Sequence, residues 1–329
     1  MTTHYAIRHL TRFSYATPVS ESVMELRMRP ATEGTQRCLQ FEVDLQPRAR
    51  VFAYRDFLGN WVHHFDLPRR HGQLAITARA QVQLDQPAIL PASLDVGTWD
   101  QVDGWSERGE QWDFRYPSHF AVWSDALIAF ADSLGTVAQR HDDPLTTARS
   151  MMAAIHREFG YAPYTTRVDS PIDEALAARQ GVCQDFTHIM LAVLRRLGLP
   201  CRYVSGYIAP RALGEDQGPT TIATHAWAEV LLPGLGWIGF DPTNNIEAGL
   251  RHVRVAIGRD YADVPPTRGT FKGGSTSTLE VSVEVTPGDK LPTLDTSVQE
   301  KVWSAEAIAL AEEQDFERRR LEQQQQQQQ

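Results

Sequence analysis

The stretch "GVCQDFTHIM" (residues 181–190) places a cysteine where a helix is expected to begin. Downstream of Cys183 the apolar side chains recur at the i, i+3, i+4, i+7 spacing of one helical face. Gly198 suits the end of such a helix, and two arginines in its last turn suit the negative end of the helix dipole. The pattern therefore predicts an amphipathic helix over residues 183–197. Its apolar positions are Phe186, Ile189, Met190, Val193, Leu194 and Leu197.

Cys183 has two interpretations in this setting. It lies at the edge of the predicted buried face, where a cysteine commonly acts as a small hydrophobic core residue. It also lies in the first turn, where the helix dipole and unpaired backbone N–H groups favour the thiolate and can donate to an oxyanion. Asp185 would oppose a thiolate, and we interpret it as a helix-start residue that accepts hydrogen bonds from backbone amides. The helix alone leaves both interpretations open.

A hairpin further along the chain carries a histidine and an aspartate. "LLPGLGW" (residues 231–237) has the proline and glycines of a turn, between two strand-like segments. A loop of three or five residues sets His225 opposite Thr243 and Asp241 opposite Trp227. The histidine and aspartate then share a face as diagonal neighbours, about 7–8 Å apart at the backbone. A four-residue loop would place them on opposite faces.

Both residues also have structural interpretations, since His225 could be a half-buried core histidine and Asp241 a turn residue before a proline. The order along the chain favours chemistry. A cysteine at a helix start, then a strand histidine and a strand aspartate, is the order that a Cys–His–Asp site needs. In such a site the histidine takes the thiol proton and the aspartate orients the imidazole.

Three regions are predicted along the chain. Residues 1–95 form a β-rich domain, a sandwich or meander, because "GQLAITARAQVQL" (residues 72–84) alternates apolar side chains and no helical stretch is evident. Residues 96–287 form an α+β domain with helices over 124–135, 145–160 and 171–180, strands from residue 201, a Gly/Pro/Ser-rich loop over 264–278 and a last strand over 278–285. Residues 288–329 form a charged, glutamine-rich tail, disordered or helical, through which the protein could oligomerise.

Composition excludes several classes of protein. The formal charge of −9 argues against a general nucleic-acid binder, and no apolar run approaches the roughly 20 residues of a membrane helix. The N-terminus lacks the apolar segment of a secretory signal, so we expect a cytoplasmic protein. The three cysteines (Cys38, Cys183 and Cys201) describe neither a disulfide framework nor a zinc site. No calcium or phosphate-binding loop is found, so no metal or cofactor is predicted.

The sequence resembles the bacterial branch of the transglutaminase-like superfamily, which has a papain-type fold. The resemblance covers residues 1–287. It is carried by "GVCQDFTHIM", "LPCRYVSGYI", "THAWAEVLLPGLGWIGFDPTNN" and "IGRDYADVPPTRGTFKGG", and by "YAIRHLTRFSYATPVSES" and "YRDFLGNWVHHFDL" near the N-terminus.

The resemblance implies a papain-like core, with a helix-borne cysteine packed on an antiparallel sheet, preceded by the β-rich domain. It implies that Cys183 is the nucleophile, His225 the general base and acid, and Asp241 the orienting carboxylate. The reaction would pass through a thioester on a peptide or glutamine-type amide, with no cofactor. The backbone N–H of Cys183 would form part of the oxyanion hole, with Tyr161 or Tyr164 as weak candidates for the second donor.

Several functions stay open from sequence. The thioester could be released by water, as in a peptidase or amidase, or by an amine, as in an acyl transferase; hydrolysis is the preferred prediction. The expected partner is a protein or peptide substrate, with no nucleic acid and no membrane. The alternative is a non-catalytic protein-binding module on the same fold, against which the intact Cys–His–Asp set argues.

Overall fold

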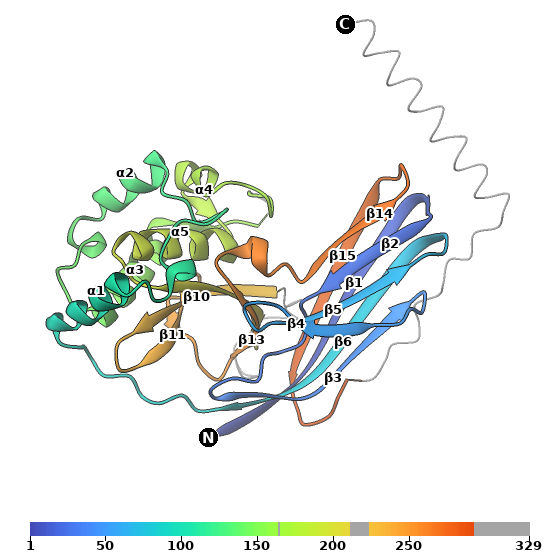
Figure 1. Ribbon diagram of the computed structural model, residues 1–329, viewed down its shortest axis with the longest axis horizontal. Helices are drawn as coiled ribbons and strands as arrows, with labels where there is room; N and C mark the ends of the chain where they lie inside the picture. The colour runs from blue at the N-terminus through green and yellow to red at the C-terminus, as the bar shows by residue number, and fades with distance from the viewer. Residues whose placement is uncertain (164, 211–223, 293–329) are drawn as a thin grey trace, which may run out of the picture.

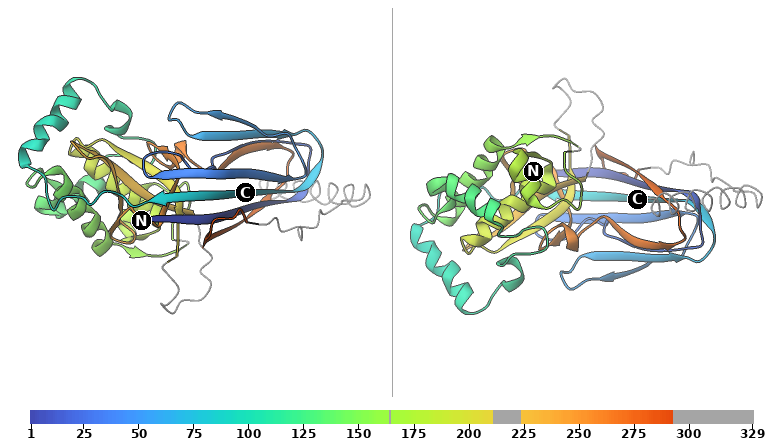
Figure 2. Two further views of the ribbon diagram at one scale, coloured as in Figure 1. Left: turned by 90° about the horizontal axis from the view of Figure 1, so that it is seen from below. Right: turned by 90° about the horizontal axis from the view of Figure 1, so that it is seen from above.

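The computed structural model describes residues 1–163, 165–210 and 224–292 (Figure 1). A region of long strands lies beside a region of helices and shorter strands, and the two views in Figure 2 place these regions at opposite ends of the molecule. None of the helices within these ranges is long and apolar enough to cross a membrane.

The region of long strands is a β-sandwich of two four-stranded antiparallel sheets. Apolar side chains from both sheets fill the space between them, among them Leu26, Phe65 and Ile76. The first sheet has the order β15-β1-β6-β3, with β15 (Ser277–Pro287), β1 (Thr2–Val19), β6 (His71–Asp85) and β3 (Gln36–Gln46). The second has the order β14-β2-β5-β4, with β14 (Thr267–Lys272), β2 (Glu21–Leu26), β5 (Trp61–Leu67) and β4 (Phe52–Arg55).

Two strands of this sandwich come from the far end of the chain, which corrects the predicted boundaries. β15 pairs with β1 from Tyr5 to Tyr15, and β14 pairs with β2. Residues 267–287 therefore belong with the β-rich region and not with the domain predicted over 96–287. The Gly/Pro/Ser-rich stretch predicted as a loop contains β14. Its composition is that of a loop, but pairing with β2 supplies the backbone hydrogen bonds that hold it extended.

The second region combines helices with one five-stranded antiparallel sheet, which confirms the α+β prediction. The sheet has the order β12-β11-β10-β9-β13, with β12 (Ile246–Glu247), β11 (Gly236–Asp241), β10 (Thr224–Leu232), β9 (Cys201–Ile208) and β13 (His252–Gly258). The α-helices are α1 (Trp99–Glu107), α2 (Asp125–Ser133), α3 (Pro144–Glu158), α4 (Ile172–Ala178) and α5 (Cys183–Arg196). Short elements complete it: 3₁₀ turns at Val96–Thr98, Trp112–Phe114, Gly135–Ala138 and Tyr261–Asp263, and a parallel pair of β7 (Gly160–Tyr161) with β8 (Gln180–Gly181).

The two faces of the five-stranded sheet have different neighbours. Alternate residues of β10, such as Ala226 and Val230, join the core that the helices complete. His225, Trp227 and Glu229 therefore lie on the other face, because successive side chains in a strand point to opposite sides. These three side chains thus point away from the apolar core between sheet and helices, whereas Cys183 packs at the edge of that core.

Glu229 anchors a buried ion network on that second face. Its carboxylate accepts hydrogen bonds from Arg202 Nε at 2.6 Å and from Arg254 Nε at 2.9 Å. Both arginines also bind Glu33, which precedes β3 of the sandwich. The two guanidinium groups thus link the buried Glu229 carboxylate of the second region to Glu33 beside the sandwich. Glu229 therefore has a packing and hydrogen-bonding role.

Gly206 leaves no room for a side chain. β9 lies between β10 and β13 there, and a Cβ on Gly206 would meet the backbone oxygen of Val253 and the ring of Trp227. We expect Gly206→Ala to lower the free energy of unfolding by about 1–3 kcal/mol, the usual cost of overpacking. Urea unfolding followed by circular dichroism measures the change. Gly288→Ala is the matched control, since its Cβ would meet nothing within 4 Å. Equal stability of the two variants would contradict this packing.

Candidate active site

Helix α5 begins at Cys183, as the sequence predicts, and a carboxylate caps it. Asp185 Oδ2 accepts hydrogen bonds from the backbone N–H of Val182 at 2.8 Å and from the Thr166 hydroxyl at 2.6 Å. Burial raises the pKa of Asp185, and these two hydrogen bonds only partly oppose that effect. Gly181 is needed here, because a Cβ would lie 2.7 Å from Asp185 Oδ2. The prediction that Asp185 bonds the helix-start backbone is confirmed.

The residues beside the cysteine hold a neighbouring segment of chain against the helix start. Gln184 Nε2 donates to the backbone oxygen of Val168 at 2.9 Å, while Asp185 binds Thr166. Cys183 itself is half-buried and packs at the edge of the helical core. It therefore has the edge position that the helical pattern predicts, with part of its surface open to a ligand.

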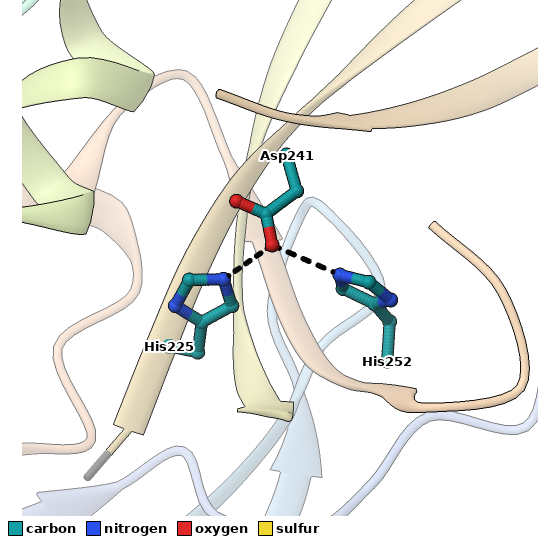
Figure 3. Close-up of side chains that lie close together, drawn as sticks. All are labelled: His225, Asp241 and His252. Carbon is teal, nitrogen blue, oxygen red and sulfur yellow. Dashed lines mark hydrogen bonds and ion pairs between the residues drawn. The ribbon is translucent and has the colours of Figure 1, made fainter. Parts of the chain in front are cut away.

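The hairpin of β10 and β11 has the predicted register. Leu232 pairs with Gly236, so the loop has three residues, and the ladder continues to Ala228 opposite Phe240. This register carries His225 and Asp241 to the same face. Figure 3 shows the result, with His225 Nε2 2.7 Å from Asp241 Oδ2. The two side chains lie together as the sequence analysis expects.

Cys183 approaches the same imidazole from α5. Burial lowers the pKa of His225, but hydrogen bonds to Asp241 and to Cys183, with the charges of both groups, outweigh burial and raise this pKa to about 10. Because Nε2 faces Asp241, Nδ1 is the ring nitrogen left for the thiol. For Asp241, burial raises the pKa, and the hydrogen bonds from His225 and a second histidine reverse this and hold it well below its usual range. The arrangement therefore favours a carboxylate at Asp241 and an imidazolium at His225.

Asp241 has more donors than the sequence analysis found. Its Oδ1 accepts the backbone N–H groups of Thr243 and Asn244 at 3.0 and 3.1 Å. Its Oδ2 accepts Asn244 Nδ2 at 2.7 Å and His252 Nε2 at 3.1 Å, in addition to His225. Asn244 had a local signal, because residues that follow a turn aspartate commonly bond it. His252 had none, because it begins the strand at the far edge of the sheet.

The comparisons with known proteins agree with this fold. The family model described as "Bacterial transglutaminase-like N-terminal region" matches residues 5–83, and that described as "Transglutaminase-like superfamily" matches residues 132–242. An uncharacterized protein of Mycobacterium leprae is 30% identical over 278 residues, which cover 84% of this chain and 96% of that protein. The chain belongs to the transglutaminase-like superfamily.

Other members of this superfamily, or proteins that share its fold, extend the comparison. An uncharacterized protein of Mycobacterium tuberculosis is 32% identical over 303 residues, covering 88% of this chain and 95% of that protein. A crystal structure of a candidate cysteine protease from Cytophaga hutchinsonii has a TM-score of 0.64 at 19% identity and covers 92% of this chain and 95% of its own. A Pseudomonas aeruginosa protein-glutamine gamma-glutamyltransferase is 29% identical over 254 residues, 71% of this chain and 35% of that protein. The resemblance and the fold class that the sequence suggested are confirmed.

Three side chains of this transglutaminase-like site lie close enough together to be considered as ligands of a metal ion. The ligand atoms of His225, Asp241 and His252 all lie within 4.8 Å of one another. However, the backbone N–H of Gly249 points at His252 Nδ1 from 3.3 Å, which places the imidazole proton on Nε2. A metal ligand needs a lone pair at that Nε2 atom. The donor set therefore suits a hydrogen-bonded carboxylate better than a metal site.

The aromatic residues near the site have different surroundings. Trp227 packs edge-on against His252, with ring centroids 5.1 Å apart, and its ring covers Gly206 and Gly239. Tyr161 is exposed; partial burial raises its pKa, and the nearby Cys183 adds to this effect. Tyr161 is therefore close enough to remain a candidate oxyanion donor, whereas Tyr164 lies outside the described residues.

The other two cysteines lie in settings unlike that of Cys183. Cys201 is buried at the start of β9, where its thiol donates to Leu199 O at 3.3 Å and burial raises its pKa to about 12. Cys38 is half-buried in β3, and burial raises its pKa as well. Within the described part of the chain, neither thiol hydrogen-bonds a histidine.

Proposed function

We propose that this protein is a cysteine amidohydrolase that cleaves peptide or glutamine-type amide bonds through a thioester on Cys183. The observation that supports this most is one buried imidazole, His225, which lies 2.7 Å from Asp241 and whose pKa the nearby Cys183 helps to raise. The helix start adds a positive dipole at the thiol and backbone N–H groups for a developing oxyanion.

The proposed reaction has two steps. The Cys183 thiolate attacks the carbonyl carbon, and the tetrahedral intermediate collapses with loss of the C–N bond as the His225 imidazolium protonates the departing amine. Neutral His225 then takes a proton from water, which attacks the thioester and releases the acid and the thiolate. Asp241 keeps the imidazole oriented with Nδ1 toward the sulfur throughout. No metal or organic cofactor takes part in these steps.

Hydrolysis and transfer differ only in the second nucleophile. The likeness to a candidate cysteine protease supports water, while the similarity to a glutamyltransferase supports an amine. We favour hydrolysis. Mass spectrometry of a peptide mixture distinguishes the outcomes, as cleavage, a one-dalton deamidation or an amine adduct. The substrate is proposed to be a protein or peptide, and a cytoplasmic location remains a prediction from sequence.

The proposal is tested by the rate at which iodoacetamide alkylates each cysteine between pH 5 and pH 10. An ordinary thiol, with a pKa of about 8.5, is only a few per cent thiolate at pH 7. We expect Cys183 to react at least about 10-fold faster than Cys38 below pH 7, and His225→Ala to remove that advantage. Peptide mass spectrometry reads all three cysteines in one sample. A rate at Cys183 no higher than that at Cys38, unchanged by His225→Ala, would refute an activated thiolate.

A further inference from the structure

A second histidine binds the same oxygen of Asp241 as His225 does. Figure 3 shows His225 and His252 on either side of the carboxylate, with Nε2–Oδ2 distances of 2.7 and 3.1 Å. The Asp241 side chain is fully buried and that of His252 is 2% exposed. An interaction between groups so completely removed from water has a strong influence on both.

The protonation state of His252 follows from its partners. The Gly249 N–H donates to Nδ1, so Nε2 carries the proton and donates to Asp241. The titratable or charged groups that act on His252 are Asp241, His225 and Arg251. Burial lowers the pKa of His252; the hydrogen bond to Asp241 opposes this, while the positive charges of His225 and Arg251 add to it, and the result is a lowered pKa. His252 is therefore a neutral donor at neutral pH.

We propose that His252 is a positioning residue for this site. Its N–H group holds the Asp241 carboxylate in one orientation, and it shares with His225 the negative charge of that carboxylate. This inference rests on the proposed function, since it concerns how that triad works. Asp241 with fewer donors would bind the His225 proton more tightly. In the proposed reaction His225 must release that proton to the leaving amine, and a weaker acid does so more slowly.

Two variants distinguish the loss of the His252 hydrogen-bond donor from the loss of side-chain volume. His252→Leu keeps an apolar side chain of similar volume but has no N–H. His252→Gln retains an amide N–H that extends to about the same depth as Nε2. We expect the pKa of His225 to rise by about one pH unit in His252→Leu and to return toward the wild-type value in His252→Gln. Nuclear magnetic resonance of ¹⁵N-labelled histidine measures this pKa directly.

The reaction rates provide a second readout. Alkylation of Cys183 requires the thiolate alone, so we expect it to be unchanged in His252→Leu at pH 7. Cleavage requires the proton of His225, and we expect kcat to fall about 3- to 10-fold. A merely structural role for His252 would lower both rates together, without moving the pKa of His225. That pattern, or an unchanged pKa, would overturn the inference.

Wild-type protein alone provides a test that does not depend on folding of the variants. The ¹⁵N shifts of His252 are expected to show the Nε2–H tautomer from pH 7 to pH 9, and a protonated Nδ1 in that range would refute the proposal. The outcomes also separate the two proposals. If Cys183 is no more reactive than Cys38, the proposed function fails. If Cys183 is activated but the His252 variants leave the pKa of His225 unchanged, only this inference fails.

Discussion

Replacing Cys183 by alanine is expected to reduce kcat for amide cleavage by about 10⁴-fold or more. Cys183 is the half-buried thiol at the start of α5 that helps to raise the pKa of His225. Without its sulfur no thioester forms, and water would have to attack the amide directly with only the oxyanion donors to help. Fold and stability should change little, because the side chain lies at the edge of the core and not within it.

The measurement compares peptide products over time by mass spectrometry for wild type and Cys183→Ala. Cys38→Ala is the matched control, since Cys38 is also half-buried but lies in β3 of the sandwich. The control should retain wild-type turnover. Undiminished cleavage by Cys183→Ala would mean that another group is the nucleophile, and undiminished biological function without cleavage would support a binding module.

The exchange of Asp241 for asparagine is expected to lower kcat about 10³- to 10⁴-fold, through the tautomer of His225. The backbone N–H groups of Thr243 and Asn244 require an oxygen at the Oδ1 position. The new amide NH₂ group then faces His225 Nε2 and donates to it. The imidazole proton moves to Nδ1, which points at the thiol, so His225 can no longer accept the thiol proton.

This variant should also alter the response to acid. The pKa of Asp241 is lowered in the folded state, so its ionised form contributes stability above the unfolded-state pKa of about 3.9, and this contribution is lost as the pH falls through the folded-state pKa. Asp241→Asn removes that part of the acid dependence. Asp143→Asn is the control for loss of a buried carboxylate. Asp143, at the start of α3, is also buried and has a lowered pKa, but it is not part of the proposed catalytic site. If Asp241→Asn alkylates Cys183 as fast as wild type at pH 7, the tautomer argument is wrong.

The sequence predicted those parts of the site that depend on local pattern. A helical repeat fixes which face of α5 is buried and where the helix begins, so the position of Cys183 could be deduced. The His225–Asp241 pair could be deduced because the loop between their strands is short. In an antiparallel hairpin, loop length sets the register, and the register sets the face on which each side chain lies.

The approach of Cys183 to His225 could not be derived in this way. It depends on the packing of α5 against β9 and β10, and only the family resemblance suggested it. The spacing of apolar residues in a helix or a strand does not show which other element packs against it. The sequence pattern predicted which residues could form the site, while the helix–sheet packing brings Cys183 near His225.

Other features depended on the tertiary structure entirely. β14 and β15 return to the sandwich because β2 and β1 offer unpaired backbone edges, although the composition of residues 264–278 is that of a loop. His252 lies in β13, which β10 and β9 separate from β11, yet it binds Asp241. Backbone groups of strands that are distant in sequence form their hydrogen bonds only when those strands pair in the folded sheet. A periodic pattern indicates which face of a strand is buried, but it does not indicate which element packs against that face.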